Sequence, residues 1–313
     1  MEKNLKVDVV IGTGPLGLAI VRELLAQGKK VRVVNRSGKA DVPANVEVKA
    51  GDIGNPEFAG EACRSAVSIY LCAKPPYTEW VDKFGPIMDG AIEAAAATGA
   101  RLIYGDNLYA YGPFTGAVTE DFPDAATGPK GKARARIAAS LMAAHKAGKV
   151  RAAIGRASDF YGPGVTESSL GERVFGFALA SKAASVLGNV DAPHTYTFID
   201  DFAKGLVTLG ENEKALGQIW LVPSAETVTT RAFITIVSEE LGKPIKIQAA
   251  PRWLISMLGI FDPTMRELPE VMYQSEQPFV VDHGKFERAF GISTTPHREA
   301  IRRTLDWYRR KAG

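Results

Sequence analysis

Six residues near the start of the chain have types and a spacing that suit phosphate binding. The segment Gly12-Thr13-Gly14-Pro15-Leu16-Gly17 follows an apolar, β-branched run and precedes a run with helical periodicity. In such a strand–turn–helix unit, Gly12 would allow the tight turn, Gly14 would let the backbone approach a pyrophosphate, and Gly17 would let helix and strand pack closely. The helix N-terminus would offer free N–H groups and a positive dipole end to the phosphates. The segment therefore predicts a dinucleotide-binding site.

The residues at the end of the second expected strand indicate which dinucleotide is bound. Asn35, Arg36 and Ser37 stand where an NAD-binding protein of this kind carries a carboxylate for the ribose 2′-hydroxyl. A guanidinium can pair with a 2′-phosphate and stack on adenine, and an amide avoids the repulsion that a carboxylate would cause. The alternative for Arg36 is an exposed loop arginine without a ligand. Its position favours NADP(H).

The elements that must position these residues follow a regular rhythm. Short β-branched runs alternate with longer helical patterns, which is typical of βαβ units and a parallel sheet. Strands are expected at 7–11, 31–34, 46–48, 68–71, 102–104, 152–154 and 220–223, and helices at 16–26, 80–97, 130–146 and 230–241. We expect an α/β fold with a Rossmann-type doubly wound parallel sheet and a smaller C-terminal substrate subdomain. The sheet would take residues 1–160 and a returning segment at about 195–222, and the subdomain would take 161–194 and 223–313.

The composition argues against several kinds of partner and site. The 313 residues have a net charge of +3, which is too small to indicate nucleic acid or an anionic membrane surface. No apolar run is long enough to span a bilayer. The two cysteines and the lack of a long apolar signal region favour a cytoplasmic protein without disulfides. The four histidines lack the spacing of metal ligands, so we expect no metal site.

Ordered segments along nearly the whole chain resemble the extended short-chain dehydrogenase/reductase family, which includes nucleotide-sugar epimerases and dehydratases. The matching segments are Gly51-Asp52-Ile53, Leu71-Cys72-Ala73, Tyr111-Gly112, the run from Gly155 to Gly164, Phe198-Ile199-Asp200-Asp201-Phe202-Ala203, and the tail from Asp282 to Tyr308. The resemblance implies that Asp52 and Ile53 border the adenine and that Cys72, Ala73 and Lys74 lie near the ribose. It also implies that Phe160 and Lys130 lie beside the cofactor.

The catalytic trio of that family is replaced in this chain. The family uses Ser or Thr, followed by Tyr-x-x-x-Lys on the next helix. The matching positions hold Asn107, Lys130 and Arg134. The pattern resembles the atypical branch of the family, in which the nucleotide-binding fold persists without the trio.

Two arrangements could replace the lost chemistry. Lys130 and Arg134 are four residues apart and would share a helix face. Repulsion between the two charges would lower the pKa of Lys130, so that it could act as a general acid. Asn107 could then donate a hydrogen bond to the developing oxyanion. Alternatively, Tyr109 or Tyr111, which follow the fifth strand, supplies the proton while the two cations hold the ribose or an anionic substrate. Against both, the tyrosines could be packing residues and the cations could face water.

Further candidates lie on the substrate side. Ser158, Asp159, Tyr161 and His194 are the polar residues that the resemblance places near the nicotinamide and the substrate. Asp159 could equally cap a turn, and His194 could be an exposed loop residue. We expect an NADP(H)-dependent oxidoreductase or epimerase-like enzyme acting on a small hydroxyl or carbonyl compound. The alternative is a non-catalytic NADP(H)-binding redox sensor or regulatory protein.

The resemblance also allows a homodimer. Small residues on two expected helices would permit the close approach of a second copy, as in the helical dimers of that family. They are Ala91, Ala94, Ala95, Ala138, Ala139 and Ala143.

Overall fold

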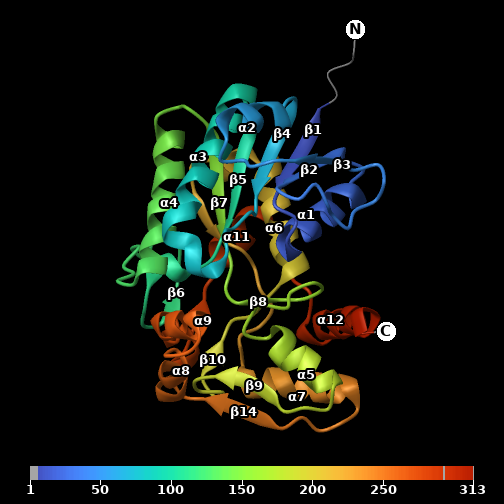
Figure 1. Ribbon diagram of the computed structural model, residues 1–313, viewed down its shortest axis with the longest axis vertical. Coiled ribbons are helices and arrows are strands. Elements are labelled where there is room, and N and C mark those ends of the chain that lie inside the picture. Colours follow the sequence, from blue (N-terminus) through green and yellow to red (C-terminus); the bar gives the residue numbers. More distant parts are fainter. Residues whose placement is uncertain (1–5, 292, 313) are drawn as a thin grey trace.

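The computed structural model describes residues 6–291 and 293–312 and is built on one parallel sheet (Figure 1). The seven strands lie in the order β12-β7-β5-β4-β1-β2-β3, and every neighbouring pair is parallel. They are β1 (Val7–Ile11), β2 (Val31–Asn35), β3 (Glu47–Ala50), β4 (Ala66–Leu71), β5 (Arg101–Asp106), β7 (Arg151–Arg156) and β12 (Ile219–Leu221). This confirms the predicted doubly wound fold, and the strand ends differ from the expected ones by a few residues.

Helices cover both faces of the sheet. One face carries α2 (Pro56–Ala62), α3 (Trp80–Thr98) and α4 (Pro129–Lys146), and the other carries α1 (Pro15–Ala26), α6 (Ile199–Glu211) and α11 (Gly284–Phe290). Successive strand residues enter opposite cores: Val9 and Ile11 pack under the first set of helices and Val10 under the second. Because the central strands are buried on both faces, they are apolar without alternation.

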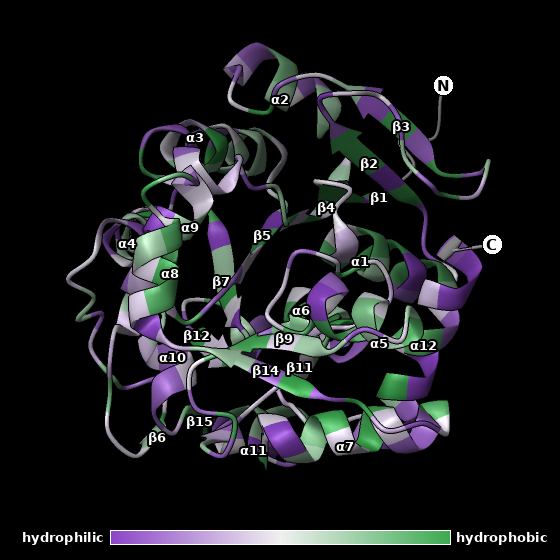
Figure 2. Ribbon diagram, turned by 60° about the horizontal axis from the view of Figure 1, so that its bottom comes forward, coloured by the Kyte–Doolittle hydropathy of each residue, from purple (hydrophilic) through white to green (hydrophobic). Residues whose placement is uncertain are grey.

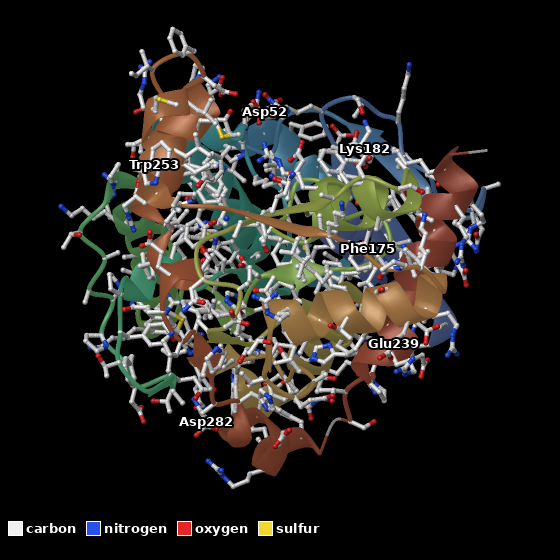
Figure 3. All side chains as sticks on the ribbon, turned by 90° about the horizontal axis from the view of Figure 1, so that it is seen from below. Asp52, Phe175, Lys182, Glu239, Trp253 and Asp282 are labelled. Carbon is white, nitrogen blue, oxygen red and sulfur yellow. The ribbon has the colours of Figure 1, made fainter. Side chains whose placement is uncertain are left out.

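The smaller part of the molecule lies below the sheet in Figure 1 and has its own core. Its main elements are α5 (Phe177–Leu179), β9 (Ala184–Leu187), α7 (Thr230–Leu241), β14 (Ile247–Ala250) and α12 (His297–Ala312). Figure 3, which views this part from below, labels the buried Phe175 together with Lys182 and Glu239 on its exterior.

The remaining elements are short. The strands are β6 (Ala117–Val118), β8 (Phe160–Tyr161), β10 (Pro193–His194), β11 (Thr197–Phe198), β13 (Val228–Thr229) and β15 (Val280–Val281). The helices and turns are η1 (Tyr77–Glu79), η2 (Tyr109–Tyr111), η3 (Gly171–Gly176), η4 (Glu213–Ala215), α8 (Arg252–Leu258), α9 (Pro263–Glu267), η5 (Leu268–Glu270) and α10 (Tyr273–Glu276).

The C-terminal part is more interleaved with the sheet than the expected domain boundaries imply. Phe286 and Phe290 of α11 pack on Trp220 of β12, with ring centroids 6.0 and 4.9 Å away. Strand β15 pairs with β6, which follows β5 in the chain. Residues 280–290 therefore return to the sheet part, whereas the expected boundaries place all of 223–313 in the subdomain.

The α8–α9 hairpin projects from the molecule and has an apolar surface. Trp253, Met257, Leu258, Ile260 and Phe261 are its large exposed side chains. Figure 2 shows α8 largely in the hydrophobic colour, and Figure 3 labels Trp253 on its outer side. Among the described residues, no helix is long and apolar enough to cross a membrane.

The alanines that were expected to admit a second chain mostly face inward. Ala91, Ala94, Ala95 and Ala138 are buried in the core between α3, α4 and the sheet. Ala139 and Ala143 are exposed on α4. The small residues therefore let the helices approach their own sheet, and only Ala139 and Ala143 remain available to a partner.

Candidate active site

The glycine loop after β1 makes a tight turn and leaves open space beside Gly14. Gly12 has a φ of +100°, and a Cβ there would lie 2.6 Å from the backbone nitrogen of Ala73. A Cβ on Gly17 would lie 1.9 Å from the carbonyl oxygen of Gly12, whereas the space beside Gly14 is open to 4 Å. The geometry at Gly12 and Gly17 agrees with the tight turn and the close packing expected there, and the open space at Gly14 leaves room for the ligand that the sequence predicts.

The first turn of α1 leaves donors free next to this open space. Gly14 is the N-cap and provides no side-chain cap, and Pro15 occupies the first helical position. Among the described residues, the N–H groups of Leu16 and Gly17 have no hydrogen-bond acceptor. The loop thus combines open space with unpaired donors at a positive helix end, and its residues fit the phosphates of a dinucleotide.

Asn35 shapes the turn at the end of β2. Its amide nitrogen donates to Thr13 Oγ1 at 2.8 Å and to the Lys39 carbonyl at 2.9 Å. Its amide oxygen accepts from the Gly38 N–H at 2.7 Å and from the Ser37 hydroxyl at 3.2 Å. Asn35 therefore links the phosphate loop to the turn that carries Arg36.

Arg36 itself is exposed at this turn, and no described residue hydrogen-bonds or ion-pairs with it. Its guanidinium is available to a ligand that enters the loop.

The other residues predicted to lie near the ribose, Cys72, Ala73 and Lys74, follow β4 and range from half-buried to exposed. Cys72 donates its N–H to the Ile11 carbonyl at 2.8 Å, and Ala73 is half-buried beside Gly12. Lys74 is exposed, with Nζ 3.4 Å from Glu167. Burial raises the pKa of the Cys72 thiol, so it stays protonated.

Of the two residues predicted to border the adenine, Asp52 lies at the surface and Ile53 lies in the core. Asp52 is exposed and accepts the Gly54 N–H at 2.9 Å. Ile53 is buried under α3, where a Cβ on Gly90 would lie 1.7 Å from the Ile53 carbonyl oxygen. The exposed side of this turn is therefore the part that a ligand can reach.

Lys130, which stands in the position of the family's tyrosine, is paired inside the protein. Its side chain is 4% exposed, and Nζ lies 2.6 Å from Glu267 Oε2, an ionic contact rather than an aligned hydrogen bond. It also donates to the Tyr77 carbonyl and lies 3.7 Å from the centroid of the Tyr77 ring. The ammonium is thus held by α9 and η1.

Arg134, in the position of the family's lysine, is also paired. Nη1 donates to the Tyr104 hydroxyl at 2.5 Å and to Asp106 Oδ1 at 3.1 Å. The guanidinium lies 4.3 Å from the Trp80 ring centroid and 4.4 Å from that of Phe84. Lys130 and Arg134 do share a helix face, since both contact Trp80.

The expectation that the repulsion between Lys130 and Arg134 is left without an opposite charge nearby is wrong. Each has a carboxylate of its own, Glu267 for Lys130 and Asp106 for Arg134.

A buried ionic network that sequence reasoning missed lies at the ends of β5 and β7. Asp106 binds Arg134 through Oδ1 and Arg156 Nε through Oδ2, both at 3.1 Å, and its side chain is fully buried. Arg156 reaches Asp124 at 2.9 Å and lies 4.5 Å from the Tyr111 ring centroid. The available signal was an acidic residue at the end of an apolar strand, directly before Asn107.

The three loop residues after β5 are placed differently. The Asn107 side-chain oxygen accepts the Tyr109 N–H at 3.1 Å, which turns this oxygen toward its own loop. The Tyr111 hydroxyl is buried without a hydrogen-bond partner among the described residues, under the Arg156 guanidinium. Tyr109 packs on Trp80, with ring centroids 5.9 Å apart. Burial, together with Tyr77 and Asp159, raises the pKa of Tyr109 well above its usual range.

Two of the four substrate-side candidates, Asp159 and His194, lie together, and Asp159 lies close enough to Tyr109 to raise the pKa of its phenol. Asp159 follows Ser158 after β7 and lies 3.3 Å from His194 Nε2, without hydrogen-bond geometry. His194 is buried, not an exposed loop residue, and it stacks on Tyr196 with ring centroids 4.3 Å apart. Asp159 also helps to raise the pKa of Tyr77, after burial and the two glutamates Glu267 and Glu270.

Two of the predicted residues lie deeper in the protein. Tyr161 is buried in the core of the smaller part, where its hydroxyl bonds His297 Nδ1 at 3.1 Å. Phe160 is half-buried against Phe202, with ring centroids 6.0 Å apart. The structure thus brings Asp159 and His194 together and holds Tyr161 apart as a packing residue.

Several buried polar atoms of this region have no hydrogen-bond partner in the part of the chain that the structure describes. They include Tyr77 Oη, Tyr111 Oη, Ser158 Oγ and His194 Nε2. Unsatisfied buried groups are costly in a folded protein, so their presence here favours a site that a ligand or water completes. No three His, Cys, Asp or Glu side chains of the described residues gather as metal ligands.

Comparison with known proteins agrees with this architecture. Residues 9–222 match the model of the NAD dependent epimerase/dehydratase family. A comparison with curated protein sequences gives no significant match.

Among solved structures, UDP-glucuronic acid 4-epimerase from Bacillus cereus in complex with NAD is similar over 99% of this chain and 100% of its own, with a TM-score of 0.79 and 17% identity. The dTDP-glucose 4,6-dehydratase from Bacillus anthracis in complex with NAD has a TM-score of 0.80 and 16% identity, over 98% of this chain and 97% of its own. The Bordetella bronchiseptica enzyme WbmH in complex with NAD+ has a TM-score of 0.75 and 15% identity, over 97% and 98%. At such identities the likeness concerns the fold, and the family match spans the phosphate loop and the sheet. The chain therefore belongs to the NAD dependent epimerase/dehydratase family.

Proposed function

We propose that this protein is an NADP(H)-dependent oxidoreductase or epimerase-like enzyme that acts on a small hydroxyl or carbonyl compound through an atypical active site. The observation that carries the proposal is the intact phosphate cradle beside an exposed, unpaired Arg36. Gly12, Gly14 and the α1 N-terminus would hold the pyrophosphate, and Arg36 would hold the 2′-phosphate. When bound there, the dinucleotide supplies or accepts a hydride.

Tyr109 is the proton donor in this proposal. The cations at the substituted family positions, Lys130 and Arg134, are already paired with carboxylates. A phenol is protonated at neutral pH, and burial raises the pKa of Tyr109 further, well above its usual range. A phenol of this kind can still give its proton to a developing alkoxide, which is the stronger base. The hydroxyl thus donates first a hydrogen bond and then a proton to the substrate oxygen.

Asp159 and His194 complete the substrate side. Their mutual distance of 3.3 Å and the unpaired Nε2 of His194 leave polar atoms for a substrate hydroxyl. Ser158 contributes a further unpaired hydroxyl. In this arrangement the three residues orient the substrate, and none of them replaces Tyr109 as the donor.

The test is NADPH oxidation with a panel of small aldehydes and ketones. We expect Tyr109→Phe to lower turnover by about 10²- to 10⁴-fold, the usual contribution of a general acid. The matched variant Lys130→Met should keep turnover within about tenfold, because its ammonium is engaged by Glu267. Loss of turnover in Lys130→Met with full activity in Tyr109→Phe would assign the proton to Lys130 instead.

The second candidate function is a non-catalytic NADP(H) sensor. The observation that favours it is the commitment of both substituted positions to internal ion pairs. A sensor would bind NADPH tightly and oxidise it with none of the panel, and cofactor binding would change the protection of a surface from proteolysis.

A further inference from the structure

A cavity of about 280 Å³ lies next to Tyr109, between three segments of the chain. The loop after β5 contributes Tyr109 and Pro113, the start of α4 contributes Gly128 and Gly131, and the segment after α9 contributes Glu270, Val271 and Tyr273. The volume is slightly below the range of roughly 300–1,000 Å³ that is typical of drug-sized ligands. It therefore suits a single ring or a group of similar size.

Two glycines let the start of α4 pack closely against the other walls of the cavity. A Cβ on Gly128 would lie 2.3 Å from Glu270 Oε1, and one on Gly131 would lie 2.3 Å from the Ala126 Cβ and 2.6 Å from the Tyr109 carbonyl oxygen. Side chains at either position would collide with the walls. The close approach of α4 to these segments thus depends on residues without a Cβ.

The charges around the cavity oppose an anionic ligand. The N-terminus of α4 could attract an anion, but Glu270 Oε1 already accepts the N–H groups of Lys130 and Gly131, at 2.8 and 3.3 Å. No lysine or arginine of the described residues lines the cavity, and the Lys130 ammonium is held by Glu267 and the Tyr77 carbonyl. A second anion would therefore meet the Glu270 carboxylate without a compensating cation.

The walls favour an uncharged ring with a hydroxyl. Two aromatic and two aliphatic residues are among those that line the cavity: Tyr109, Tyr273, Val271 and Pro113. Glu270 Oε2 has no hydrogen-bond donor among the described residues, so it can accept an O–H from a ligand. Burial raises the pKa of Tyr273 to about 12, which keeps its phenol neutral.

We propose that this cavity is a substrate subsite that takes a small, uncharged, hydroxyl-bearing ring compound and excludes anionic ones. The assignment to substrate rests on the proposed role of Tyr109, which lines the cavity. It separates this chain from the similar structures whose names specify anionic nucleotide sugars, UDP-glucuronic acid and dTDP-glucose.

The experiment is a ligand-observed NMR titration of the full-length protein with benzyl alcohol and with benzoate, a pair with the same ring and different charge. We expect benzyl alcohol to bind at least about tenfold more tightly than benzoate, and Glu270→Gln to reduce this preference to less than about threefold. The glutamine keeps an acceptor for the Lys130 N–H, so the helix start is preserved. Thr127→Phe, at an exposed rim position, should abolish binding of benzyl alcohol.

Three results would overturn the inference: benzoate binding as tightly as benzyl alcohol, neither probe binding, or Thr127→Phe leaving binding unchanged. An NADPH titration of the same samples separates this inference from the proposed function. If NADPH binds and the probes do not, the subsite is wrong and the cofactor assignment stands. If the probes bind and NADPH does not, the cofactor assignment fails.

Discussion

The two halves of the candidate site lie on the same edge of one sheet but use their polar groups in opposite ways. Around β1 and α1, the N–H groups of Leu16 and Gly17 and the guanidinium of Arg36 have no partner among the described residues. Around β5 and α4, Lys130, Arg134 and Asp106 are buried and paired with one another or with nearby residues. The first half holds its polar atoms free for a ligand, and the second uses them to join elements of the fold.

This difference changes how the replaced catalytic trio should be interpreted. A charged residue at a family's catalytic position suggests new chemistry, but a charge that is buried and neutralised inside the chain mainly fixes the structure. The unpaired atoms, Tyr77 Oη, Ser158 Oγ and His194 Nε2, mark the region where chemistry remains available. This is why we propose Tyr109, and neither Lys130 nor Arg134, as the proton donor.

The largest expected effect concerns the buried network. Asp106→Asn should lower the free energy of unfolding by about 3–5 kcal/mol, because Arg134 and Arg156 would lose their shared buried carboxylate. Denaturant unfolding followed by circular dichroism measures the change. The matched control is Asp124→Asn: the Asp124 side chain is 30% exposed and binds Arg156 alone among the described residues, and we expect its loss to cost no more than about 1–2 kcal/mol. Equal losses in the two variants would contradict a structural role for Asp106.

The next effect breaks the cofactor half. Gly17→Ala should weaken NADPH binding at least about a hundredfold, about 2.7 kcal/mol, because the added Cβ would lie 1.9 Å from the Gly12 carbonyl oxygen and displace the loop. Isothermal titration measures the affinity. Gly60→Ala, in α2 with open space around it, is the control and should bind NADPH like the wild type. Unchanged binding in Gly17→Ala would remove the loop from the site.

A smaller effect tests the pairing of Lys130. In a double-mutant cycle of Lys130→Met and Glu267→Gln, we expect a coupling energy of about 1–2 kcal/mol in the free energy of unfolding, since the two groups lie 2.6 Å apart and only Glu267 is partly exposed. NADPH affinity should change by less than about threefold. A strong loss of NADPH affinity with no coupling would show that Lys130 holds the cofactor, as the family resemblance implies.

The smallest effect separates Tyr109 from Tyr111 by how each contributes to the pH dependence of stability. Burial raises the folded-state pKa of Tyr109 well above the unfolded value near 10, so its contribution to stability is complete below about pH 10 and is lost as the pH rises through the folded pKa. Tyr109→Phe should therefore reduce the alkaline loss of stability in urea unfolding between about pH 9 and 11. Tyr111→Phe should do so less, because Arg156 offsets the rise in the pKa of Tyr111. The reverse order would contradict this difference between the two phenols.

The sequence predicted what depends on local geometry. The roles of Gly12, Gly14 and Gly17 follow from backbone shape within one turn, and the structure gives each the expected space. The strands were predicted because apolar, β-branched runs identify them regardless of their neighbours. The shared face of Lys130 and Arg134 follows from helical periodicity alone, and it too is confirmed.

The sequence could not predict partners that come from distant segments. Glu267 and Glu270 reach α4 from the far C-terminal half, and no spacing in the sequence relates them to Lys130. Without them, two adjacent cations suggested a perturbed general acid. The inward orientation of Ala91 and Ala138 likewise depends on how α3 and α4 pack on the sheet, which their small size alone does not determine.

The central claim is that the free polar groups of the first half form an NADP(H) site, and the most direct test is a fluorescence titration with NADPH and NADH side by side. We expect NADPH to bind at least about tenfold more tightly than NADH, and Arg36→Ala to remove most of this preference without changing NADH binding, since a charge-assisted pair contributes about 1.5–3 kcal/mol. Lys39→Ala, which removes an exposed cation from the same turn, should keep the preference. Equal binding of the two dinucleotides to the wild type, or a preference that survives in Arg36→Ala, would contradict the claim.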